Sequence, residues 1–104
     1  MDEVFIRNRI TELRTQKGIS EYKMSLDLGH SRSYIQGISS GRSMPSLSEF
    51  LYICDYLDIT PKYFFDDTID NPALLQTVCD KLKALSEDDL IALLGIINRL
   101  SSKK

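Results

Sequence analysis

The chain has 104 residues, of which 42% are hydrophobic and 27% are charged, and its formal net charge is −2. This length and apolar fraction predict one globular domain with room for a short appendage, and they exclude a disordered or fibrous chain. The charge excludes a uniformly basic nucleic-acid binder, so any attraction to DNA or acidic lipid must come from a local patch.

The sequence gives no sign of a membrane segment, an export signal or a zinc site. Its longest apolar run, from Leu90 to Ile97, is about half of the ~20 residues that span a bilayer. The first residues are acidic where a signal peptide is basic, so we expect a cytoplasmic protein. Cys54 and Cys79 are far apart and the chain has one histidine, which predicts two reduced thiols and no metal or cofactor.

The spacing of apolar residues predicts helices almost throughout and no strand, so the expected fold class is all-α. The first helix covers about residues 4–17 and stops at Gly18, since glycine readily takes the left-handed conformation that ends helices. Ser20 caps a second helix over about 21–28, and a third covers about 31–39. The expected inner faces of these helices consist of Ile10, Leu13, Met24, Leu28, Ile35 and Ile38.

Two further helices complete the first part of the chain. The fourth begins at a capping box from Ser46 to Glu49, in which the hydroxyl and the carboxylate satisfy each other's backbone amides. A short fifth helix begins at Pro61, because proline suits the first helical position. The expected buried face of the fourth helix consists of Phe50, Leu51, Cys54 and Leu57.

The acidic, turn-rich stretch 66–71 is the clearest boundary in the sequence. We therefore predict a domain over residues 1–65 and an extension over 66–104, which forms a helical hairpin from helices at about 73–85 and 87–101. Acidic residues at the start of the last helix and Lys103-Lys104 at its end suit the helix dipole.

The last helix has a wide apolar surface, with one stripe formed by Leu90, Leu93, Leu94, Ile97 and Leu100. Two interpretations are open. The extension packs back on the fourth and fifth helices, or the stripe meets a second copy of the chain. We favour a homodimer, in which a second copy covers the surplus apolar area.

The second and third helices have the spacing of a helix-turn-helix, with Gly29-His30-Ser31 as the turn. In that motif the second helix of the pair enters the major groove of DNA. Arg32 and Ser33 are the expected first-turn side chains. Arginine matches the two acceptors of guanine, and serine can bond to any base.

A pattern spread over about residues 4–65 carries a family resemblance. It consists of Leu13-Arg14, Gly18-Ile19-Ser20, Met24, Leu28-Gly29, Ser31-Arg32-Ser33-Tyr34-Ile35, Ile38, Gly41-Arg42, Pro45-Ser46-Leu47 and Leu57-Asp58-Ile59-Thr60. With these residues the sequence resembles the Cro/lambda-repressor-like (XRE) helix-turn-helix family. The resemblance implies a five-helix DNA-binding domain of the kind found in bacterial and phage transcription regulators, which bind operator DNA as dimers.

The resemblance also implies a set of DNA contacts. The third helix would be the recognition helix. The residues expected to read bases are Arg32, Ser33, Tyr34 and Gly37, and those expected at the DNA backbone are Ser20, Ser31, Arg42 and Arg14.

Several positions depart from the family pattern. Glu21 stands where glutamine is usual, and its carboxylate would repel phosphate unless it is paired. Ser39 replaces a glutamate that commonly pairs with an arginine of the first helix, so Arg14 has no obvious partner and is expected to turn to solvent or to a phosphate. Ser25 replaces a small alanine. His30 replaces an apolar residue, and it covers the turn, faces a phosphate or titrates as a switch.

Charge counting favours weak binding by a single copy. Residues 1–65 carry eight basic and eight acidic side chains, a net charge of zero. A local patch could still form if Arg32, Arg42 and Arg14, with Lys17 or Arg9, share one face. Dimerisation would then contribute much of the affinity.

The function expected from the sequence is a homodimeric transcriptional regulator, most simply a repressor, acting on a pseudo-palindromic site with half-site centres about 10 base pairs or a multiple apart. The alternative is an interaction module of the same fold, or an antitoxin-like protein, with weak or no DNA binding. No catalytic triad or phosphate-binding glycine loop is present in the sequence, so we do not expect an enzyme.

Overall fold

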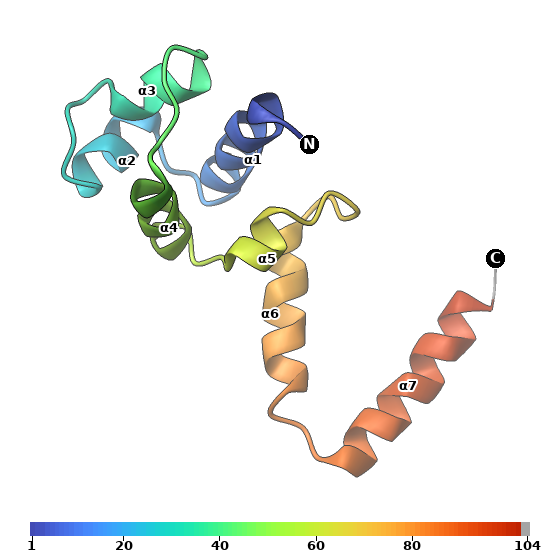
Figure 1. The fold of residues 1–104 in the computed structure, drawn as a ribbon. Helices are drawn as coiled ribbons and strands as arrows, with labels where there is room; N and C mark the ends of the chain where they lie inside the picture. Colours follow the sequence, from blue (N-terminus) through green and yellow to red (C-terminus); the bar gives the residue numbers. More distant parts are fainter. Residues whose placement is uncertain (103–104) are drawn as a thin grey trace. The chain divides into compact units, whose positions relative to one another are not determined.

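The computed structural model describes residues 1–102 and is shown in Figure 1. Within these residues the fold is entirely helical, which confirms the predicted fold class. The helices are α1 Glu3–Gln16, α2 Glu21–Asp27, α3 Tyr34–Ser39, α4 Leu47–Tyr56, α5 Pro61–Phe64, α6 Pro72–Leu82 and α7 Glu87–Ser101. Lys103 and Lys104, which we expected to favour the end of the last helix, lie outside the described residues.

The hydrophobic core lies within α1–α5 and the loops between them. In this part of the chain α3 packs against both α1 and α2, and α4 contacts α5 (Figure 1). The inner residues predicted for the first three helices are all buried. The core consists of Ile10, Leu13, Met24, Leu28, Ile35, Ile38, Phe50, Ile53, Cys54, Leu57, Ile59 and Phe64.

The predicted buried face of α4 is wrong at one position. Leu51 is 48% exposed, whereas Ile53 is fully buried. At 100° per residue, positions 50, 53, 54 and 57 of a helix share one face and position 51 falls outside it, so Ile53 and not Leu51 completes the stripe.

The chain divides into two compact units, Met1–Ala73 and Leu74–Lys104. The sequence prediction placed the boundary at residue 66, but the acidic stretch 66–71 belongs to the first unit. Pro72 is fully buried, and Ala73 packs against the core. Contacts of the stretch with α1 account for the difference.

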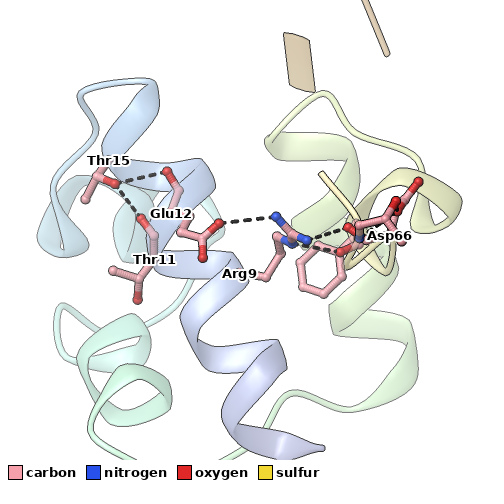
Figure 2. A network of polar contacts seen from close by, with 7 residues as sticks. Arg9, Thr11, Glu12, Thr15 and Asp66 are labelled. Carbon is pink, nitrogen blue, oxygen red and sulfur yellow. Dashed lines mark hydrogen bonds and ion pairs between the residues drawn. The ribbon is translucent and has the colours of Figure 1, made fainter. Parts of the chain in front are cut away.

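Arg9 of α1 makes those contacts, as Figure 2 shows. Its side chain is 5% exposed. The guanidinium donates to the backbone carbonyls of Phe64 at 3.0 Å and Asp66 at 2.6 Å, and it contacts the Glu12 carboxylate at 3.2 Å. It also lies over the Phe5 ring, 5.0 Å from the ring centre. Arg9 therefore ties α1 to the chain that follows α5, and it is not a surface cation.

The second unit contains most of α6 and all of α7. None of its described residues is buried, and α7 begins at Ser86, whose hydroxyl accepts from the Asp89 amide at 3.2 Å. No helix in the described part of the chain has the length and apolar character needed to cross a membrane.

Candidate nucleic-acid interface

The turn between α2 and α3 is fixed by backbone geometry and by one buried hydroxyl. Gly29 has φ +79°, a left-handed conformation that glycine adopts without steric cost. Ser25 is fully buried in α2. Its Oγ donates to the carbonyl of Glu21 at 2.7 Å and accepts from the amide of Ile35 at 3.0 Å. A hydroxyl of α2 thus satisfies one of the free amides at the start of α3 and sets the position of α3 on α2.

The third helix begins three residues later than predicted. The amide of Tyr34 donates to the Ser31 carbonyl at 3.1 Å, which makes a turn of residues 31–34, and the side chain of Ser33 forms no cap bond. Arg32 and Ser33 therefore precede the helix and are not in its first turn. The helix starts at Tyr34 because Ser25 of α2 supplies an acceptor for the Ile35 amide. That acceptor lies in another helix, so the local sequence does not indicate it.

His30 covers the turn, one of the three roles considered for it. Its ring stacks on Tyr34 with centroids 3.7 Å apart, and its Nε2 lies 3.0 Å from the Glu49 carboxylate. The capping box of α4 is therefore only half formed. Ser46 Oγ accepts from the Glu49 amide at 3.2 Å as expected, but the Glu49 carboxylate pairs with His30. Burial raises the pKa of the Tyr34 phenol, and the nearby Glu49 carboxylate adds to this effect.

The predicted site residues differ in how accessible they are. Arg32, Ser33, Ser31 and Arg42 are exposed, whereas Tyr34 is half-buried under His30. Within residues 1–73, which the structure describes in full, Arg32 forms no hydrogen bond or ion pair. Ser20 is exposed and caps α2, because its Oγ accepts from the Lys23 amide at 3.0 Å.

Gly37 faces the protein and not solvent. It is buried, and its carbonyl accepts from the amides of Arg42 and Ser43 at 3.0 and 3.1 Å. A Cβ at this position would lie 3.3 Å from Ser43 Oγ. Gly37 was expected to read bases. Because it is buried and its carbonyl holds the loop after α3, we do not include it among the residues proposed to contact bases.

Sequence analysis missed Gln36. This side chain is exposed on α3, and its Oε1 accepts a hydrogen bond from Nη2 of Arg42. A signal was available in the predicted helix over about 31–39, where Gln36 stands four residues after Arg32 and three after Ser33, although the structure places both of these before α3.

Two departures from the family pattern compensate for each other. The Glu21 carboxylate, which we expected to repel phosphate if unpaired, accepts a hydrogen bond from the Ser39 hydroxyl. The pairing joins the start of α2 to the end of α3. Glu21 is half-buried, so its charge is partly withdrawn from the exposed surface.

The wider basic patch considered from the sequence does not assemble in full. Arg9 is buried, and Lys17 pairs with Asp58 at 3.4 Å. The expectation that Arg14 lacks a partner is wrong, because its Nη1 donates to the Ile19 carbonyl at 2.8 Å. Arg14 is half-buried and its Nε is buried without a partner, so much of its guanidinium faces the α1–α2 turn. The exposed cations beside α3 are thereby reduced mainly to Arg32 and Arg42.

The described residues contain no cluster of histidine, cysteine and acidic side chains that could hold a metal ion.

A comparison with known families matches residues 8–68 to the helix-turn-helix domain family. A search of curated proteins found no match. Among solved structures, the chain is similar to a chain of the SinR protein/SinI protein complex, at 20% identity and a TM-score of 0.57, over 94% of this chain and 99% of that one. At this identity the similarity shows the fold alone.

Proposed function

The chain belongs to the helix-turn-helix domain family, and from this premise we propose that it is a sequence-specific transcriptional regulator that binds duplex DNA as a homodimer. In this proposal α3 lies in the major groove, and blocking of a promoter is the simplest mode of action. A DNA-binding regulator is the function that the family and the fold favour.

The observation that carries the proposal is the exposure of Arg32 and its lack of a partner among residues 1–73. An exposed guanidinium with no partner inside the first unit sits immediately before α3, in a turn whose position is fixed by the bonds of Ser25. A side chain held there without an internal partner is available for the O6 and N7 acceptors of guanine. Ser33 beside it would contact a neighbouring base, and Tyr34 could contribute its exposed edge.

Backbone contacts would fix the register of the protein on DNA. Ser20 and Ser31 offer exposed hydroxyls near the starts of α2 and α3, and Arg42 offers a cation in the loop after α3. Arg14 contributes less in this proposal, because Ile19 already accepts from its guanidinium. With few exposed cations beside α3, each copy would make few phosphate contacts, so the salt dependence of its binding should be shallow.

Dimerisation through α7 is the second part of the proposal. Leu90, Leu94, Ile97 and Leu100 are 39%, 54%, 51% and 64% exposed, and Leu93 beside them is half-buried. Their spacing places them along one side of the helix. Fully burying a leucine contributes about 1.5–3 kcal/mol, so covering such a stripe with its copy supplies several kcal/mol to association.

Selection from a library of random duplexes tests DNA binding directly. The purified protein should enrich a pseudo-palindrome, and Arg32→Ala should weaken binding to it by about 1–3 kcal/mol, or roughly 5- to 150-fold. Lys62→Ala, which removes the same charge from α5, is the matched control and should change affinity little. If no duplex is enriched at low salt, the protein is instead an interaction module.

Sedimentation analysis tests the dimer. Leu94→Glu should produce a monomer, whereas Leu51→Glu, at a similarly exposed leucine of α4, should leave the dimer intact. The similar solved structure is of a protein in complex with another protein. A wild-type chain that is monomeric but binds a second protein through α7 would favour the interaction module over the homodimer.

A further inference from the structure

Gln36 and Arg42 form a pair on the exposed side of α3. The Gln36 side chain is exposed, and its Oε1 accepts from Nη2 of Arg42, six residues further along the chain. Gln36 is exposed on α3, and the exposed Arg32 lies in the turn that leads into the same helix, so we expect both side chains to reach the same groove. The pairing lies on the surface that the proposed function assigns to DNA.

Arg42 is held in place by the backbone beneath it. Its amide and that of Ser43 both donate to the carbonyl of Gly37, which anchors the loop on α3. The absence of a side chain at Gly37 permits this approach, since a Cβ would come within 3.3 Å of Ser43 Oγ. The backbone of Arg42 is therefore fixed relative to α3, and its guanidinium can contact Gln36.

We propose that Gln36 is a base-reading residue and that Arg42 positions its amide to prefer guanine. The inference rests on the proposed function, because it names the base recognised by the same surface. Arg42 acts as a positioning residue, since it works through the Gln36 amide.

The preference follows from hydrogen-bond chemistry. An unpaired glutamine reads adenine with its carbonyl and amino group together, because adenine offers one donor and one acceptor in the major groove. Here Arg42 uses one of the two lone pairs of the carbonyl and places a positive charge beside it, so the Nε2 donors are the part of the amide that meets a base most favourably. Guanine presents two acceptors, O6 and N7, to those donors.

Charge favours the same base. The Arg42 guanidinium beside the amide attracts the acceptors of guanine and disfavours the amino group of adenine. Gln36 would thus read guanine as long as Arg42 holds its carbonyl, and it would regain its ordinary preference for adenine if that contact were removed.

The experiment compares the sequences selected by the full-length wild type, Gln36→Ala, Gln36→Glu and Arg42→Ala, with circular dichroism to show that each variant is folded. The wild type should enrich guanine at one position of each half-site, and Gln36→Ala should lose about five-fold or more of that preference. Arg42→Ala should change the preferred base at that position from guanine to adenine. Gln36→Glu, which accepts but does not donate, should favour cytosine there.

The outcomes separate this inference from the proposed function. If the wild type enriches no sequence, the DNA-binding function fails and the inference fails with it. If the wild type enriches a site but Gln36→Ala keeps every base preference, or Arg42→Ala weakens binding without changing the preferred base, DNA binding stands and the pairing is overturned. Arg42→Lys provides a second check, because it restores the charge and should restore part of the preference for guanine.

Discussion

Replacing Arg9 with methionine tests how strongly the first unit depends on the link between α1 and the chain after α5. Methionine keeps much of the apolar stem but removes the guanidinium. The carbonyls of Phe64 and Asp66 then lose the donors that lie 3.0 and 2.6 Å away. The Glu12 carboxylate loses its ion pair as well (Figure 2).

The two carbonyl contacts dominate the expected loss. A hydrogen bond to a charged group contributes about 1.5–3 kcal/mol, so the pair is worth about 3–6 kcal/mol. Removing a buried charge recovers part of its desolvation cost, which leaves a net decrease of about 2–4 kcal/mol in the free energy of unfolding. In a unit of this size that corresponds to a decrease in Tm of roughly 10 °C or more.

Urea unfolding followed by circular dichroism measures this change. Glu12→Gln is the matched control, because Glu12 is 49% exposed and an exposed ion pair contributes less than about 1 kcal/mol. Arg9→Lys keeps the charge but not the planar fork, so its stability should fall between the other two. The reasoning is refuted if Arg9→Met costs no more than Glu12→Gln.

Two further predictions concern pH and charge. Burial and the hydrogen bond to Asp27 raise the pKa of Tyr56 to about 12 from its ordinary value near 10, so the unfolded chain ionises first and stability contributed by the phenol is lost as pH rises through this range. Tyr56→Phe should make the urea midpoint fall less between about pH 9 and about pH 12, and an unchanged slope would contradict this. Glu21→Gln keeps an acceptor for Ser39 but removes a negative charge beside the proposed DNA surface. Its affinity for a selected duplex should rise about 2- to 5-fold at low salt and approach that of the wild type at high salt, as measured by fluorescence anisotropy, and a gain independent of salt would refute an electrostatic cause.

Local sequence signals predicted the helices well but not every boundary. Apolar periodicity and capping residues located α1, α2 and α7 to within a residue or two, because those signals lie inside the elements themselves. The start of α3 was wrong because its acceptor is Ser25 of α2. The first compact unit extends to Ala73, beyond the acidic stretch, for a similar reason, since the contacts that hold Asp66 come from Arg9, far away in the sequence.

In the candidate site, too, local signals predicted some residues, whereas contacts between distant residues could not be predicted. Spacing within the helix-turn-helix singled out Arg32, although it placed this residue in the first turn of the third helix and not before it. Gln36 stood within the same predicted helix. The contacts that define the surface could not be predicted in this way. Ser39 meets Glu21 and Arg42 meets Gln36 only after α3 has folded against α2 and its own loop. Glu21 and Ser39, which each depart from the family pattern, thus form a hydrogen bond with each other once α2 and α3 are packed.

The Ser25 hydroxyl donates one hydrogen bond within α2 and accepts one from α3, and this has a consequence for the duplex that the protein would bind. Because the same oxygen bonds to both helices, tilting α3 away from α2 would break one of these bonds in a place that water does not reach. The two helices should therefore meet DNA as a rigid wedge, and adjustment at the interface must come from bending or untwisting of the duplex. Base steps that deform easily would then affect affinity even where no side chain touches them.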